Sequence, residues 1–299
     1  MRGLREGLRA LACAWVLSAC LGPDDAVPPG RDRVRVQTIG APENVVQTVS
    51  RAVPTNLRPQ ERALFKRRDA AGAVWSSSPM NAFDLTGIAW GGGRAVLITD
   101  RHALGAAHTP KPARGTELTF YDQGGWPVTR TAIGVVTLPR LRGADLDTRV
   151  VRLDEPVPAG VTVYPLAAGD AATLAAARTP VITTFARGGR TARGETGWGA
   201  FATIATLSRV TSGGARLAYD VRADLFAPGS QAGHAAMWGD SGSPSFLATG
   251  DGLALLSHTH TSGGAGRGPN YADPEVQRLI REAVATLNAA SGGAPGENR

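Results

Sequence analysis

The segment Gly239–Pro244, Gly-Asp-Ser-Gly-Ser-Pro, constrains the chain more than any other stretch, because residue identity and spacing together point to one chemistry. A serine hydroxyl is a poor nucleophile until a base takes its proton, and the oxyanion that it creates needs backbone N–H donors. Gly239 has no Cβ, so its N–H and that of Ser241 are able to converge on one point. Losing one such donor costs about 3–4 kcal/mol of transition-state stabilisation. The same residue types also form polar turns, so a base and an acid elsewhere must decide.

The order of these partners along the chain separates two templates for an activated serine. An α/β-hydrolase nucleophile lies in Gly-x-Ser-x-Gly before a helix, and its acid and then its histidine follow it. Here Ser243 stands in place of the last glycine, and Pro244 is tolerated only in the first turn of a helix. The only acidic residue between Ser241 and the histidines that follow is Asp251, and this spacing leaves too short a loop for that fold. The base and the acid are therefore expected upstream.

Residues 94–109 predict the base, His108, at the end of a β-hairpin, because an apolar run, a polar turn at 99–101 and a second short apolar run precede it. The segment resembles the strand-turn-strand of trypsin-like proteases, which ends in Ala-Ala-His, here residues 106–108. His102 is the competing candidate, because some bacterial relatives of that family carry their base directly after a similar turn. His108 is preferred, since the apolar residues around the turn fall in the register that the trypsin pattern needs.

The acid is expected between base and nucleophile, at the start of a strand. The segment Asp147–Leu153 is similar, residue by residue, to the Asp-Ile-x-Leu-Ile-Lys-Leu segment of the trypsin-like family, so Asp147 is the predicted acid. Asp145 is the rival, but it lies outside the β-branched run that would bury the carboxylate. The separations fit one barrel between base and acid and a second before the nucleophile. The resemblance covers about residues 80–290.

The resemblance implies a serine endopeptidase that hydrolyses the peptide bonds of a polypeptide substrate through a His-Asp-Ser triad. In that family His108 would take the Ser241 proton and return it to the leaving group, while Asp147 would hold the imidazole in the required tautomer. The N–H groups of Gly239 and Ser241 would form the oxyanion hole. No cofactor is implied. The competing hypothesis is a non-catalytic, protease-fold lipoprotein that only binds, although such proteins usually lack a triad member and none is missing here.

Four positions are candidates for substrate binding. Ser257 matches the family serine that hydrogen-bonds the buried aspartate, and it opens the segment 257–259 along which a substrate strand would pair. Ala235, six positions before the nucleophile, stands where trypsin keeps the aspartate that binds Lys or Arg, so a tryptic preference is not expected. His258 favours an acidic substrate side chain, as in glutamyl endopeptidases, whereas Thr259 favours a small one, and both alternatives stay open.

Composition and spacing argue against some partners. The formal net charge is +7, yet lysine occurs only at Lys66 and Lys111 and no basic cluster is interleaved with aromatic residues, so no nucleic-acid partner is expected. Strand alternation places His258 and His260 on one face, but no third ligand lies in evident register, so no metal is predicted. We expect a monomer.

From residue 83 onward the chain reads as β, because short apolar or alternating runs are separated by glycine-rich turns without βαβ alternation. The expected strands are 83–90, 95–97, 118–121, 126–136, 147–153, 161–166, 181–185, 201–210, 215–221, 244–247 and 253–257. The one strong helix is expected at about 273–289, where Asp273 is a suitable N-cap and one apolar stripe follows.

The family resemblance turns this pattern into a fold. It implies an all-β, chymotrypsin-like fold of two six-stranded antiparallel β-barrels with a C-terminal α-helix packed on the second barrel. The protease domain is expected over 71–299, with lobes of about 71–160 and 161–270. Abundant glycine, 38 residues of 299, suits many short strands joined by tight turns.

Residues 1–19 have the features of an export signal, a basic start and an apolar middle too short to span a bilayer. The run closes with Leu17–Cys20, which resembles the bacterial lipobox, so Cys20 is the predicted lipidation site; the alternative is a simple small-residue cleavage site. Leu21 favours the outer membrane in that family of signals. The implied protein is a cell-envelope lipoprotein that faces the periplasm or the exterior and attaches to the membrane through its N-terminal lipid. Because Cys13 leaves with the signal, no disulfide is expected.

Residues 20–70 form a Pro-, Asp- and Arg-containing lead with one candidate helix near 59–70. The segment is interpreted either as a tether that lifts the domain off the membrane or as a propeptide cut after Arg67 or Arg68. Trypsin-type activation frees an Ile-Val-Gly-Gly-like terminus that pairs with the aspartate before the nucleophile, here Asp240. The sequence contains no such terminus, so activation by that switch is not expected.

Overall fold

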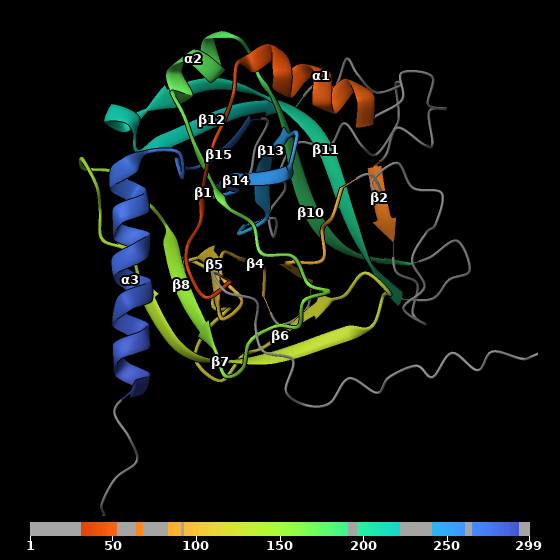
Figure 1. Cartoon of the computed structure of the whole chain (residues 1–299), viewed down its shortest axis with the longest axis vertical. Helices are drawn as coiled ribbons and strands as arrows, with labels where there is room; N and C mark the ends of the chain where they lie inside the picture. The colour runs from red at the N-terminus through yellow and green to blue at the C-terminus, as the bar shows by residue number, and fades with distance from the viewer. Residues whose placement is uncertain are drawn as a thin grey trace, which may run out of the picture.

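The structure, a computed structural model, describes residues 31–52, 64–67, 83–90, 93–190, 196–221, 241–260 and 265–292. It is mostly β, with two sheets and a long C-terminal helix (Figure 1). The helical elements are α1 (Pro42–Ala52), α2 (Ala171–Ala176), the short 3-10 turn η2 (Ser212–Gly214) and α3 (Pro274–Gly292). None of the described helices is both long and apolar enough to cross a bilayer.

The first sheet has six antiparallel strands and is nearly closed. In spatial order its strands are β3 (Ile88–Ala89), β4 (Ala95–Leu97), β5 (His102–Ala106), β8 (Thr148–Leu153), β7 (Pro127–Thr137) and β6 (Glu117–Tyr121). The two ends of the sheet meet, because the N–H of Trp90 beside β3 donates to the carbonyl of Thr119 in β6 at 3.0 Å. The first sheet thus confirms one predicted six-stranded antiparallel barrel, which is nearly closed. The predicted C-terminal helix is confirmed as α3.

The second sheet has nine strands. Their order is β1 (Val36–Thr38), β9 (Leu166–Ala168), β14 (Gly252–His258), β13 (Pro244–Thr249), β10 (Pro180–Arg190), β11 (Thr196–Thr211), β12 (Arg216–Val221) and β15 (Ala265–Pro269), with β2 (Leu64–Arg67) beside β11. It exceeds the predicted six strands because β1, β2 and β9 join it, and β9 pairs in parallel with both β1 and β14. The strand order alone therefore does not establish a second six-stranded barrel.

Several elements depart from the predictions. The candidate helix near 59–70 is wrong where the structure describes that segment, because β2 is a strand paired with β11. The short helix α2 and the strands β1 and β15 were not among the expected elements. Each of these strands gains its hydrogen bonds from a partner distant in sequence, so its own residues give a weak local signal.

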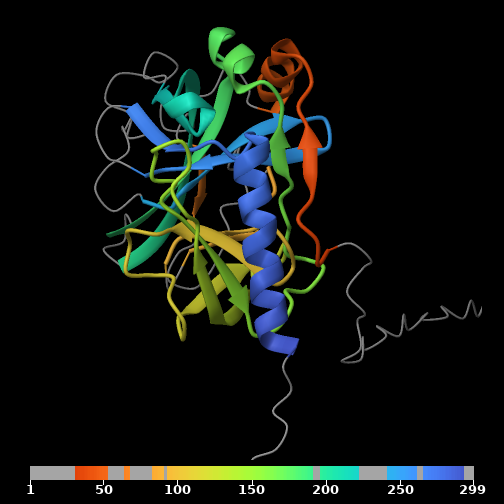
Figure 2. The same cartoon turned by 90° about the vertical axis from the view of Figure 1, so that its left-hand side faces the viewer.

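Part of the stretch interpreted as a tether or propeptide packs on the second sheet. The strand β1 runs alongside β9 (Figure 2). The guanidinium of Arg35 donates to the carbonyl of Val163 at 2.5 Å, which adds a side-chain bond to the strand pairing. Val45 and Val49 of α1 are buried. Residues 31–52 therefore contribute to the packed core.

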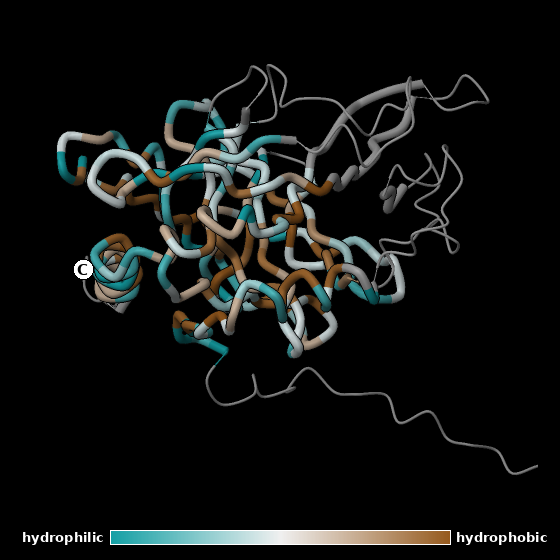
Figure 3. Tube along the Cα trace, turned by 90° about the horizontal axis from the view of Figure 1, so that it is seen from above, coloured by the Kyte–Doolittle hydropathy of each residue, from teal (hydrophilic) through white to brown (hydrophobic). Residues whose placement is uncertain are grey.

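One hydrophobic cluster joins the two sheets and α3. Its members include Val96 and Val150 of the first sheet, Phe246 and Leu255 of the second, and Ile280 of α3, and all five are fully buried. Figure 3, in which α3 is seen end-on, shows the hydrophobic residues gathered among the strands. Burial of apolar surface is the main favourable term in folding, so this shared cluster holds the two sheets at a fixed separation.

The helix α3 packs against β7 and β8 of the six-stranded sheet. The prediction that it packs on the second lobe is therefore incomplete, because α3 lies along the first sheet and also reaches the second, where Nε2 of Gln277 donates to the carbonyl of Ala167 in β9 at 2.9 Å. A Cβ on Gly134 of β7 would lie 2.8 Å from Cδ2 of Leu287, so glycine at this position permits the close approach of the helix. The predicted N-cap is confirmed, because Oδ1 of Asp273 accepts the N–H of Glu275 at 2.8 Å.

Truncation of the α3 core position tests this packing. Ile280 is fully buried, so Ile280→Ala should lower the free energy of unfolding by about 2–5 kcal/mol, the usual cost of such a cavity. The exposed neighbour Arg281 on the same helix is the control, and Arg281→Ala should change it by about 0.5 kcal/mol or less. Urea denaturation measures both, and equal effects of the two substitutions would contradict the assigned helix face.

Candidate active site

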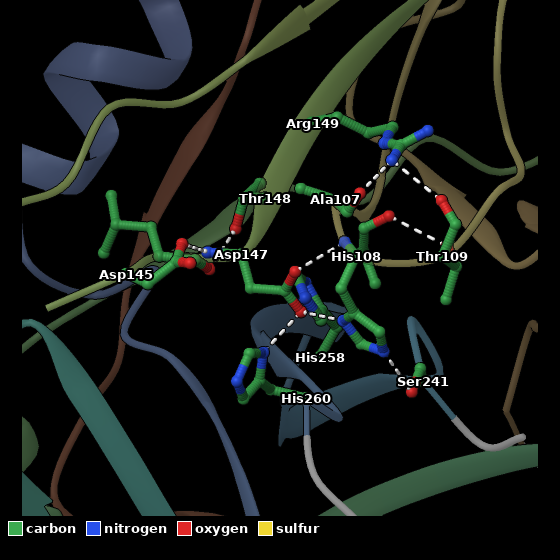
Figure 4. Close-up of polar contacts among 12 residues, drawn as sticks. Ala107, His108, Thr109, Asp145, Asp147, Thr148, Arg149, Ser241, His258 and His260 are labelled. Atoms are coloured by element: carbon green, nitrogen blue, oxygen red, sulfur yellow. Dashed lines mark hydrogen bonds and ion pairs between the residues drawn. The ribbon is translucent and has the colours of Figure 1, made fainter. Parts of the chain in front are cut away.

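The three side chains predicted for catalysis stand at strand ends that meet between the two sheets (Figure 4). His108 follows β5, Asp147 directly precedes β8, and Ser241 lies shortly before β13. Strands β5 and β8 are neighbours, with Ala106 opposite Thr148, and this pairing brings the base beside the acid. The base and acid thus come from the six-stranded sheet, and the hydroxyl comes from the nine-stranded sheet.

Two hydrogen bonds join these side chains in a line. Nδ1 of His108 lies 2.6 Å from Oδ2 of Asp147, and Nε2 lies 2.7 Å from Oγ of Ser241. An ionised carboxylate only accepts, so Nδ1 carries the proton and the lone pair of Nε2 faces the serine hydroxyl. The side chain of Asp147 is 3% exposed and that of His108 is 44% exposed, so the acid is sealed while the base stays accessible. The structure brings together the three residues that the sequence predicted.

Asp147 adopts an unusual backbone conformation with φ of 48°, in the left-handed region that non-glycine residues rarely occupy. Its N–H donates to Oδ1 of Asp145 at 2.8 Å, and its own Oδ1 accepts the backbone N–H of His108 at 2.7 Å. Asp145, the rival candidate for the acid, thus bonds the backbone of Asp147 and supports its turn.

The carboxylate of Asp147 stays ionised in spite of its burial. Burial raises its pKa. Hydrogen bonds from His260 and from the side chain and backbone of His108 lower the pKa by more than burial raises it, and the resulting pKa is about 2. At neutral pH the group therefore carries a negative charge next to the His108 imidazole.

His260 is part of this cluster and was not predicted to be. It follows β14, and its Nδ1 hydrogen-bonds the same Oδ2 of Asp147 that His108 contacts (Figure 4). From the sequence, His260 was placed only beside His258 on one strand face, as half of a candidate metal pair. Its approach to Asp147 depends on where the end of β14 lies relative to the first sheet, and the sequence does not reveal this placement.

Arg149 is a second residue that sequence reasoning missed. Its guanidinium donates to the carbonyls of Ala107 and Thr109, the second at 2.8 Å (Figure 4). Because Arg149 lies in β8, it ties the strand that follows Asp147 to both sides of His108. It occupies a position that the family segment leaves variable, so the resemblance gave no signal for it.

His102, the competing candidate for the base, lies in the core of the first sheet. Its Nδ1 is 2.8 Å from Oγ1 of Thr99, and its side chain is buried. Burial, aided by the charges of Arg152 and Arg101, lowers its pKa to about 4, so the ring is neutral at physiological pH. Its contacts are those of a packed residue, and Ser241 is bonded to His108.

The predicted hydrogen bond between Ser257 and Asp147 is wrong. The Ser257 hydroxyl donates to the carbonyl of Pro269 at 2.6 Å, because β14 runs beside the segment that contains β15. The bond from the second sheet to the carboxylate comes from His260.

His258 and Thr259, the other candidates for substrate contact, are also buried. Nδ1 of His258 lies 2.5 Å from the hydroxyl of Tyr271, and burial lowers the pKa of this imidazole to about 4. The N–H of Thr259 donates to Ser243 and its carbonyl accepts from Gly242, both at 2.8 Å. The backbone of Thr259 is therefore not a free edge for a substrate strand, and substrate contact by its side chain or that of His258 stays a prediction.

Gly242, directly after the serine, is required by the close approach of the two sheets. Its φ is +84°, and a Cβ there would lie 3.2 Å from the carbonyl oxygen of Arg94. Any other residue would strain the backbone and crowd the first sheet.

Three predicted site residues, Gly239, Ala235 and Cys20, lie outside the residues that the structure describes, as does the predicted signal segment 1–19. The predictions that Gly239 donates to the oxyanion, that Ala235 lines the substrate pocket and that Cys20 carries a lipid therefore stay predictions.

Metal binding would need a rearrangement of the site. Within the described ranges, His108, Asp147 and His260 offer ligand atoms that all lie within 4.8 Å of one another. Both Nδ1 atoms already donate protons to one carboxylate oxygen, so a metal ion would have to replace these protons and part the groups. The earlier candidate pair is separated in function, because His258 bonds Tyr271 while His260 bonds Asp147.

No protein-family model matches the chain, and no curated protein matches it in sequence.

The low pKa of Asp147 predicts a pH-dependent stability. A folded pKa of about 2, below the ordinary 3.8, means that the ionised carboxylate stabilises the fold above pH about 4 and that this contribution is lost as the pH falls toward 2. The free energy of unfolding of Asp147→Asn should therefore depend less on pH in this window than that of the wild type. Urea denaturation at several pH values measures the two curves, and parallel curves would contradict the assigned pKa.

Proposed function

We propose that the protein is a serine endopeptidase of the trypsin/chymotrypsin-like family that hydrolyses peptide bonds through Ser241, His108 and Asp147. The observation that carries the proposal is the line of two hydrogen bonds, 2.6 and 2.7 Å long, from the Asp147 carboxylate through the His108 imidazole to the Ser241 hydroxyl. The chain order of base, acid and serine is the order of that family. An imidazole whose Nε2 faces a serine hydroxyl in this arrangement is a general base poised at an alcohol.

In the proposed first step, Oγ of Ser241 attacks the carbonyl carbon of the peptide while its proton passes to Nε2 of His108. The tetrahedral intermediate then breaks its C–N bond, and the imidazolium gives that proton to the departing amine. The acyl group remains on Oγ of Ser241 as an ester. Water then loses a proton to Nε2, and its oxygen adds to the carbonyl carbon of this ester. The bond between that carbon and Oγ breaks as the proton returns to Oγ. Peptide and water are the only compounds consumed.

Asp147 stabilises the imidazolium that forms in both steps. Its ionised carboxylate, held at a pKa of about 2, faces Nδ1 and fixes the tautomer. Neutralising the aspartate in such a triad costs about 10⁴ in turnover. The proposed oxyanion donors are the backbone N–H groups of Gly239 and Ser241, which would act where the charge develops.

The proposal includes a second six-stranded antiparallel barrel, formed by β10 to β15. Strands β10, β11, β12 and β15 pair in succession, and β10, β13 and β14 do the same on the other side. The N–H of His260, at the end of β14, donates to the carbonyl of Arg267 in β15 at 2.7 Å and links the two runs. Strands β1, β2 and β9 would then be additions to the outside of this barrel.

The proposed substrate is a polypeptide that lies across the meeting point of the two sheets, where His108 is accessible. Ala235 in place of an aspartate favours a substrate side chain other than Lys or Arg. We also retain the proposal of a monomeric lipoprotein, anchored through Cys20 at the outer membrane or elsewhere in the cell envelope, with the segment after Cys20 as its connection to the domain.

A fluorophosphonate probe tests this function, because an activated hydroxyl attacks its phosphorus. Folded wild type should be modified at Ser241, as read by peptide mapping with mass spectrometry. His108→Ala should react about 10²–10⁴-fold more slowly, the contribution of a positioned base, and Ser241→Ala should not be modified at that peptide. Wild type unfolded in urea controls for the intrinsic reactivity of serine.

The outcome that contradicts the proposal is a wild type that remains unmodified while circular dichroism shows it folded. The alternative, a protease-fold lipoprotein that binds without cutting, would then account for the chain.

A further inference from the structure

The strongest feature without a role in the three-residue mechanism is the second imidazole on Asp147. His260 follows β14 of the nine-stranded sheet, and its backbone N–H donates to the carbonyl of Arg267 in β15 at 2.7 Å. Its side chain is 20% exposed and its Nδ1 bonds Oδ2 of Asp147. The rings of His108 and His260 meet edge to face, with their centroids 5.4 Å apart (Figure 4).

The carboxylate of Asp147 is therefore held by three donors from two sheets. Oδ1 accepts the backbone N–H of His108, and Oδ2 accepts both Nδ1 atoms, those of His108 and His260. Two of these donors belong to His108 itself, so they tie the carboxylate to the base and not to any second element. The donor on His260 is independent of His108, because it comes from the opposite sheet.

From this geometry we propose that His260 is a positioning residue for the proposed hydrolysis. It fixes Oδ2 of Asp147 at Nδ1 of His108, and by sharing that oxygen it limits how strongly the carboxylate stabilises the His108 imidazolium. The inference rests on the proposed function, since it concerns the rate and pH dependence of the Ser241 reaction.

Other ionisable groups near the carboxylate enter the same balance. The charged side chains of Arg216 in β12 and Arg149 in β8 interact electrostatically with Asp147. The buried imidazole of His258 in β14 interacts with Asp147, His108 and His260. These groups are unchanged in any variant of residue 260, so a comparison among such variants isolates the contribution of the Nδ1 donor.

The matched pair His260→Asn and His260→Leu supplies this comparison. An asparagine amide places an N–H donor close to the position of a histidine Nδ1, and it does not titrate. Leucine has nearly the shape of asparagine but no donor. The measurement is the rate of fluorophosphonate modification of Ser241 in the full chain as a function of pH, for wild type and both variants.

We expect His260→Asn to keep a plateau rate close to that of wild type. His260→Leu should be slower by about ten- to a hundredfold at the plateau, the worth of one hydrogen bond to a charged group. Its acidic limb should also lie at higher pH than that of His260→Asn, because Oδ2, with one donor fewer, stabilises the His108 imidazolium more strongly. Rescue by asparagine together with the displaced limb is the predicted result.

Two results would overturn the inference alone. If wild type is modified and both variants match it in rate and pH profile, His260 does not position the carboxylate. If both variants lose the same rate and neither limb moves, the imidazole contributes packing and not a hydrogen bond. A folded wild type that is not modified at all would instead overturn the proposed function, and this inference with it.

Discussion

The buried, ionised carboxylate of Asp147 is the constraint on which the site depends. A charge that is 97% removed from solvent is costly unless hydrogen bonds replace its water, and here three donors do so. Two of the donors belong to His108, so satisfying the carboxylate also fixes the position and tautomer of the base. The tautomer in turn leaves Nε2 free to accept from the serine hydroxyl. The hydrogen bonds that stabilise the buried charge are thus the same bonds that orient the catalytic base.

This arrangement requires the two sheets to keep a fixed position relative to each other. The first sheet presents base and acid from adjacent strands, and Arg149 ties the β8 strand to the loop around the base. The second sheet presents the hydroxyl and His260. A hydrophobic cluster common to both sheets and α3 sets their separation, and Gly242 lets the serine loop reach the backbone of Arg94. Residues 31–52 add a strand and a helix to the second sheet, and so to the support of the site.

The sequence predicted those parts that depend on residue identity. His108, Asp147 and Ser241 each stand in a short segment whose pattern is interpretable alone, and the structure brings them together. The contacts of His260 and Arg149 depend on how distant strands align, for which the sequence has no marker. The same limit explains the errors. The hydroxyl of Ser257 points to Pro269 because of the β14 register, and α3 packs on β7 and β8 as well as on the second sheet, because its apolar stripe fits either.

The most direct test of the shared carboxylate is proton NMR of the imidazole N–H groups in protein labelled with ¹⁵N-histidine. Short hydrogen bonds to Oδ2 of Asp147 should give two strongly downfield Nδ1–H signals, from His108 and His260. His260→Leu should remove one of them, and Asp147→Asn should displace both upfield. Downfield signals that are absent, or that persist unchanged in Asp147→Asn, would contradict the account.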